Sequence, residues 1–317
     1  MKRTLGFLGI AILTAGCTTV STEPTDSVNL PTENLIAELG VPGAWARVTP
    51  IPESDVTNQV LKKGLLADKA GNRSAALKWF QEAADLKNAE GEYYLGTYYF
   101  NGYGVEQDYG QAVALYQASA EQRYVDAVRA LAGCYLRGKG VAENDNWAFT
   151  LYKDAADQGN WDANIQMADC YLNGWGTDKD EALAFSIYQK YAELGDHLAK
   201  YDVIKCMYDG TGTSMDIVGA VNMCQKMADE GDAEAQNDMG NFYSGGNGVQ
   251  KDLVESVRWY QKAADQGNSD AESNLAYCYE NGTGISVDRE KAKWWFKKAA
   301  DQGDADALKQ WASLEGN

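Results

Sequence analysis

One stretch of the sequence has residue types and spacing that could bind a nucleotide phosphate. From Gly133 to Lys139 it reads G-C-Y-L-R-G-K, which matches the first seven positions of the loop that wraps phosphates with backbone N–H groups. The next residue is Gly140, whereas that loop continues with a Ser or Thr that holds Mg²⁺. No buried strand is readable ahead of the stretch, although a phosphate-binding loop follows one. We therefore predict no nucleotide at Lys139.

The same stretch is one copy of a glycine-containing turn that returns along the chain. Its copies lie 36 residues apart, at 98–104, 134–140, 170–176, 206–212, 242–248 and 278–284. Only one of them carries Gly-Lys. Self-similarity at a fixed period of 20–50 residues is typical of a solenoid of stacked units. The turn is therefore interpreted as part of a repeat rather than as a nucleotide site.

Residues for catalysis or metal binding are scarce. The chain has one histidine, His197, which lies at a repeat boundary and is expected to be exposed near the start of a helix. The patterns S-x-x-K, G-x-S-x-G and H-E-x-x-H, which carry nucleophiles or zinc ligands, do not occur. We predict no catalytic residue, no metal and no cofactor.

Cysteines share one column of the repeat in four of its units. They are Cys134, Cys170, Cys206 and Cys278. Packed helices lie about 8–10 Å apart, which places equivalent Cα atoms beyond the limit of about 7 Å for a disulfide. We expect these thiols to be free and buried. Cys224 shares a unit with Cys206, and this is the pair that could form a disulfide.

The charge of the chain excludes some partners. The formal net charge is −18 and the sequence pI is about 4.5, so nucleic acids and anionic lipid surfaces are repelled. Beyond the N-terminus there is no apolar run of 18 residues, and no membrane-spanning helix is predicted there. No nucleic-acid partner is therefore predicted.

Residues 1–16 have the pattern of a secretory signal. Lys2 and Arg3 precede a short apolar run, and small residues follow it. The ending L-T-A-G-C at 13–17 resembles a bacterial lipoprotein lipobox, and this resemblance implies cleavage before Cys17 and its lipidation. Thr18, in place of Asp, then implies the outer membrane under the sorting pattern of enteric bacteria. We expect the lipoprotein to face the periplasm, with the cell surface as the alternative. A signal that is cleaved without lipidation is the other interpretation.

Two helices are predicted in each repeat after a tether at 17–55, which holds all five prolines. In the first full unit, helix A covers about 89–100 and ends at Gly102. Helix B follows Asp108, a good N-cap residue, and ends near Glu121. The predicted fold is all-α, a right-handed solenoid of antiparallel helix pairs with a 36-residue repeat.

The repeat pattern carries a family resemblance. The run A-x-A-x-x-x-L-G-x-x-Y, then G-x-G-V-x-x-D, then A-x-x-W-Y-x-K-A-A-x-Q-G resembles the Sel-one-like repeat (SLR), a relative of the tetratricopeptide repeat. The resemblance covers six full units at 88–303, with a shorter capping unit at 56–87 and a C-terminal capping helix at 304–317. It implies an adaptor or scaffold protein without enzymatic activity.

A candidate protein-binding surface is inferred from columns of helix A that vary between units, because columns that hold the fold should vary little. In related solenoids helix A lines the concave face, so these columns are predicted to line a groove. The predicted partner-binding residues are Tyr93, Phe100, Arg129, Leu136, Ile165, Asp169, Leu172, Tyr201, Lys205, Tyr208, Asn237, Asn241 and Tyr277.

Three hypotheses for function follow from this sequence. The first is a membrane-anchored periplasmic scaffold that receives a partner segment in the helix A groove. The second is a surface-exposed lipoprotein that binds a host factor. The third is a hydrolase acting on β-lactams or peptidoglycan, for which no nucleophile and base are visible.

Overall fold

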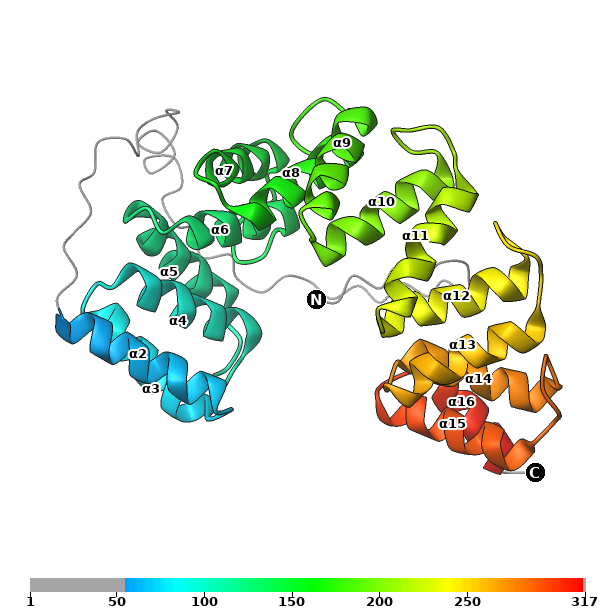
Figure 1. The fold of residues 1–317 in the computed structure, drawn as a ribbon. Coiled ribbons are helices and arrows are strands. Elements are labelled where there is room, and N and C mark those ends of the chain that lie inside the picture. The colour runs from blue at the N-terminus through cyan, green and yellow to red at the C-terminus, as the bar shows by residue number, and fades with distance from the viewer. Residues whose placement is uncertain (1–54, 316–317) are drawn as a thin grey trace. The chain divides into compact units, whose positions relative to one another are not determined.

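The computed structural model describes residues 55–315, and this part of the chain is helical, without a strand (Figure 1). Its helices are α2 (Asp55–Lys69), α3 (Arg73–Asp85), α4 (Ala89–Asn101), α5 (Tyr109–Glu121), α6 (Val125–Arg137), α7 (Asp145–Asp157), α8 (Trp161–Asn173), α9 (Glu181–Glu193), α10 (His197–Asp209), α11 (Ile217–Asp229), α12 (Ala233–Gly245), α13 (Leu253–Asp265), α14 (Ser269–Asn281), α15 (Arg289–Asp301) and α16 (Ala305–Glu315). The all-α solenoid fold is confirmed. The predicted signal, the predicted lipidation site Cys17 and the predicted tether up to residue 54 lie outside the described residues.

Two compact units divide the described residues, 55–187 and 188–315, with the boundary inside α9. In the first unit each helix from α2 to α8 packs against the next helix along the chain. In the second unit the same holds from α10 to α16. Helix A of each full repeat begins 36 residues after the previous one, and so does helix B. Both units therefore stack the same helix pair.

Local sequence signals set the helix ends as predicted. The side chain of Asp108 accepts a hydrogen bond from the Gln111 N–H at the start of α5. Equivalent caps recur at Asn144, Asp216, Asp252 and Asp288. Helix A ends at a glycine in the left-handed region, for example Gly174 after α8. A side-chain cap typically contributes about 1 kcal/mol, so each repeat specifies its own helix boundaries.

The second glycine of the G-x-G turn joins one repeat to the preceding one. A Cβ on Gly176 would lie 2.0 Å from the carbonyl oxygen of Asp145, at the start of α7. A Cβ on Gly284 would lie equally close to the carbonyl oxygen of Leu253. Real Cβ atoms do not approach an oxygen so closely, and the positive φ of both residues also favours glycine. The turn seen in the nucleotide-like motif is thus a packing contact between repeats.

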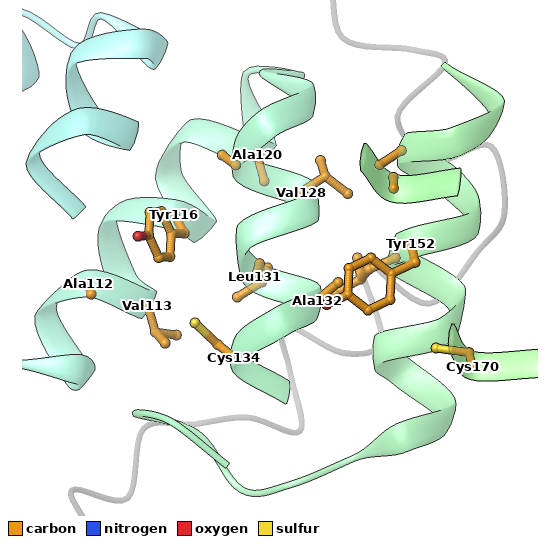
Figure 2. Close-up of a cluster of buried hydrophobic side chains, with 14 residues drawn as sticks. Ala112, Val113, Tyr116, Ala120, Val128, Leu131, Ala132, Cys134, Tyr152 and Cys170 are labelled. Carbon is orange, nitrogen blue, oxygen red and sulfur yellow. The ribbon is translucent and has the colours of Figure 1, made fainter. Parts of the chain in front are cut away.

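The cores of the units contain small and large side chains in alternation. Figure 2 shows the cluster over α5 to α8, where Tyr116 and Tyr152 pack with small residues such as Ala132. Cys134 and Cys170 lie in this cluster as free thiols, as predicted, and burial raises the pKa of each to about 12.

The possible disulfide of Cys206 and Cys224 is not formed, because both are free cysteines. The Cys224 thiol instead points at the Ala235 carbonyl oxygen, 3.5 Å away. It therefore acts as a small buried side chain, with its pKa raised by burial.

Candidate protein-binding surface

One variable column of helix A connects one repeat to the next, and it holds Tyr93, Arg129, Ile165, Tyr201, Asn237 and Ser273. The Tyr201 hydroxyl donates a hydrogen bond to Asp232, the residue that caps α12. Two repeats further on, the Ser273 hydroxyl donates to Asp304, which caps the first turn of α16, at 2.6 Å. Both pairs are separated by 31 residues. This column therefore faces the helix start of the following repeat.

Tyr201 is a correction to the predicted surface. Its side chain is 1% exposed, because α10, α11 and α12 enclose it in one core cluster. Burial raises the pKa of its hydroxyl, and the Asp232 carboxylate, which accepts a hydrogen bond from that hydroxyl, raises the pKa further. His197 also contacts Asp232, with 2.5 Å between Nε2 and Oδ2, and is half exposed at the start of α10, as expected.

Asp232 is held as a carboxylate by these contacts. Burial alone would raise its pKa, but hydrogen bonds from Tyr201, the Ala235 N–H and His197 hold that pKa below the ordinary value. The arrangement resembles a catalytic constellation only in residue type. The carboxylate is occupied in capping α12, and the Tyr201 hydroxyl is buried against it. The group stabilises the repeat junction.

Three further predicted residues are also buried, which is a second correction. They are Ile165, Asp169 and Asn237. Asn237 accepts a hydrogen bond from Asn274 at 2.9 Å, across consecutive A helices. A buried side chain that already bonds within the array offers no surface to a partner.

A second variable column of helix A holds Thr97, Gly133, Asp169, Lys205, Asn241 and Tyr277. Two of its members, Asn241 and Tyr277, contact the aromatic residue of helix B in the same repeat. Tyr260 donates to Asn241 at 2.8 Å. The Tyr277 ring lies 4.8 Å from the Phe296 ring in an edge-on arrangement. Even so, Tyr277 is 38% exposed, and Lys205 is exposed in α10. These two are the most open members of the predicted set.

The remaining predicted residues are half-buried. The ring centre of Tyr93 lies 5.3 Å from that of Tyr124, the N-cap residue of α6. The ring centre of Phe100 lies 5.0 Å from that of Tyr109. The ring centres of Tyr208 and Phe242 lie 5.9 Å apart. The others of this kind are Arg129, Leu136 and Leu172. Each has one face in the packing between helices and another open to solvent, so they stay candidates for partner contact.

Sequence reasoning missed a buried acid in α12. Asp238 is 3% exposed, and burial together with the nearby Glu234, Asp232 and Asp270 carboxylates raises its pKa well above the ordinary value. A hydrogen bond with Asn241 is the opposing effect. No signal in the sequence marked this position. The periodicity of helix A predicts which face of the helix is buried, but it does not predict that an acidic residue of that helix is buried as well.

Neither a membrane span nor a metal cluster is found within residues 55–315. No helix there is long and apolar enough to cross a bilayer. No three metal-ligating side chains of the His, Cys, Asp or Glu type gather in the same range.

The comparison with protein families identifies the repeat. A model described as the Sel1 repeat matches residues 61–88, 89–124, 125–160, 161–196, 198–232, 233–268 and 269–304. The chain belongs to the Sel1 repeat family. Six of these matches begin at or next to the start of a helix A, and the shorter first one covers most of α2 and α3. Sel1 repeat proteins are in general non-enzymatic scaffolds that bind protein partners.

Solved structures support the same assignment. The chain is 30% identical to a Sel1 repeat protein from Oxalobacter formigenes, with a TM-score of 0.64, over 76% of this chain and 99% of that one. It is 29% identical to c5321, described as a protective antigen of uropathogenic Escherichia coli strains with an SLR fold. There the TM-score is 0.54, and the match covers 81% of this Sel1 repeat chain but only 56% of the E. coli protein.

A more distant structure shares the fold alone. It is a tetratricopeptide repeat protein from Parabacteroides merdae, 14% identical, with a TM-score of 0.51 over 83% of this chain and all of that one. A comparison with curated proteins found no match.

Proposed function

We propose that this Sel1 repeat protein is a scaffold anchored to the outer membrane through lipidated Cys17, facing the periplasm, that binds a protein partner through exposed residues of its A helices. The observation that carries the proposal is the array of seven repeats, since such arrays present extended surfaces to protein partners. The lipobox-like ending at 13–17 supports the anchor. The exposed Lys205 and Tyr277 support helix A as the contact surface.

The contact surface is tested by photo-crosslinking in living cells. A photoreactive residue replaces Lys205 in α10, and the matched control replaces Lys226 in α11. Both are exposed lysines of one repeat, one on helix A and the other on helix B. A discrete protein adduct from position 205 alone supports the proposal. Equal capture from both positions, or capture from 226 alone, contradicts it.

The anchor is tested separately. Metabolic labelling with a fatty-acid analogue should label the chain, and Cys17→Ser should abolish the label and release the protein from the membrane fraction. Membrane retention of the unlabelled variant would contradict the lipid anchor. It would leave the proposed role of the A helices in partner binding unaffected.

A second candidate is a lipoprotein on the cell surface that binds a host factor. It is favoured by the 29% identity to a protein described as a protective antigen, although that match covers only part of the E. coli protein. Protease treatment of intact cells separates the two candidates. Digestion before the outer membrane is permeabilised supports the surface candidate, and digestion only afterwards supports the periplasmic one.

A further inference from the structure

The first helix of the array, α2, can be aligned with α4 by its packing. A Cβ on Gly64 of α2 would meet the Phe80 ring at 2.7 Å. A Cβ on Gly96 of α4 would meet the Tyr116 ring at 2.9 Å. Both glycines thus make room for the aromatic residue of the helix B that follows. A shift of 32 residues, 96 minus 64, therefore relates α2 to α4.

This alignment shows that α2 exposes a face that α4 buries. We call this face the α2 edge face, and it consists of Val56, Gln59, Lys63 and Leu66. Its equivalents in α4 are buried, and they are Asn88, Gly91, Leu95 and Tyr98. In α2, by contrast, Val56 is 62% exposed and Leu66 is 59% exposed, and the other two are exposed as well.

The helix that covers these positions in α4 is the preceding helix B, α3. A Cβ on Gly91 would lie 2.5 Å from the Ala83 Cβ, and the Tyr98 ring packs edge-on against Phe80 at 5.1 Å. The α2 edge face thus has the form of a surface made for a helix that precedes it in the chain. In Figure 1, α2 is the first labelled helix, with α3 beside it.

The chain before α2 contains a segment with the right chemistry. Within residues 33–45, Leu35, Ile36 and Leu39 are spaced to share one face of a short helix, and Trp45 follows. Glu33 and Glu38 give this segment negative charge. The α2 edge face holds Lys63, with Lys62 next to it, both exposed. The apolar residues and the negative charge of residues 33–45 therefore complement the apolar residues and the positive charge of the α2 edge face.

The connection between segment and helix has the right length. Nine residues, 46–54, separate them, and nine extended residues reach about 30 Å. A helix of 15 residues such as α2 is about 22 Å long, so the segment reaches any part of it. A tethered segment also has a high effective concentration, whereas two copies of a chain with net charge −18 repel each other.

We propose that residues 33–45 of the same chain cover the α2 edge face and close the N-terminal end of the repeat array. Leu35, Ile36 and Leu39 pack on Val56 and Leu66, and Glu38 lies near Lys63. The segment takes the position that α3 has on α4. Part of the stretch assigned from sequence to a tether is then a capping element of the fold.

The test is hydrogen–deuterium exchange of the full chain in detergent, read by mass spectrometry. Leu39→Asp places a charge in the apolar contact, and Val28→Asp is the matched control earlier in the same N-terminal region. We expect amide exchange in α2 to become at least tenfold faster in L39D and to stay unchanged in V28D. Exchange in α13, far along the chain, reports that the array stays folded.

A second variant tests the contact from the other side. Leu66→Asp changes an exposed residue of α2, so it leaves the fold intact while weakening the same contact. It should make exchange in residues 33–45 as fast as in an unstructured peptide, with α13 unchanged. Unchanged α2 exchange in L39D overturns the proposal. Protection of α2 from amide exchange that falls on dilution of the protein, and that is the same in L39D, would show that a second copy of the chain covers the α2 edge face. That result also overturns the proposal.

Discussion

The Tyr201 hydroxyl donates a hydrogen bond to Asp232, so a side chain of α10 stabilises the N-cap residue of α12 in the next repeat. The same carboxylate accepts the Ala235 N–H at 2.7 Å and contacts His197. The Asp232 side chain therefore caps the start of α12, accepts a hydrogen bond from a tyrosine and connects two repeats. Stability of the second unit depends on this junction as well as on apolar burial.

Tyr201→Phe should lower the free energy of unfolding by about 1.5–3 kcal/mol, the usual net contribution of a hydrogen bond to a charged group, because the acceptor is the Asp232 carboxylate. The ring and its packing are kept, so the loss reports the hydroxyl. The measurement is urea unfolding followed by circular dichroism. Tyr103→Phe is the control, because Tyr103 is 39% exposed and should change stability by less than about 0.5 kcal/mol. Equal losses would contradict a role for the Tyr201–Asp232 bond.

Gly176→Ala should destabilise the array by about 2–5 kcal/mol, because the new Cβ would collide with the Asp145 carbonyl oxygen and φ is +68°. Gly159→Ala is the matched control. Gly159 also has a positive φ, +87°, but its Cβ would meet nothing within 4 Å, so only the backbone cost of about 1–2 kcal/mol applies. The comparison uses urea midpoints of both variants. If both variants lost the same stability, the close approach of Gly176 to the Asp145 carbonyl oxygen would not contribute to the stability of the array.

Asp238→Asn should raise the melting temperature at pH 7. The folded pKa of Asp238 lies above the unfolded value of about 3.9, so ionisation at neutral pH disfavours the folded state. Near pH 3 the carboxyl group is protonated in both states, and the advantage of the variant should vanish. The measurement is thermal unfolding from pH 3 to pH 7. A variant that is less stable at pH 7 would contradict the assigned burial cost.

Asp232→Asn should show the opposite sign. The folded pKa of Asp232 is lowered, so its carboxylate stabilises the fold above the unfolded pKa, and this stabilisation is lost as pH falls through the folded pKa. Asn is also a good N-cap residue, so the change reports mainly the charge. The melting temperature should fall at pH 7, with a smaller difference at pH 3. A pH-independent difference would indicate packing rather than charge.

Cys206 and Cys224 should react as free thiols. Both are buried, so labelling of the native chain should be slow and labelling in denaturant fast, with no requirement for a reductant. Mass spectrometry of alkylated peptides measures this directly. Cys134 and Cys170, in the same repeat column as Cys206, serve as internal references. If a reductant increased alkylation only in the peptides that contain Cys206 and Cys224, the two residues would be joined by a disulfide.

Much of the fold was predictable because its signals are local. Asp108 and its equivalents bond the first turn of their own helix, and the glycine after helix A adopts positive φ within its own turn. Such features act within a few residues, so a 36-residue period carries them through the chain. The solenoid, the helix pairs and the buried thiols followed from these signals. The exclusion of a nucleotide loop rested on the same repetition.

The partner surface was less predictable, because burial in helix A depends on residues about 31 positions away. Tyr201, Ile165 and Asn237 vary between repeats and therefore resembled surface positions. Tertiary packing placed the start of the next helix A against this column, and Tyr201 became buried on Asp232. Lys205, four residues later, stayed exposed. Sequence by itself determined where each helix begins and ends, through caps and glycines, whereas only the stacking of one repeat on the next decided which variable side chains remain open to a partner.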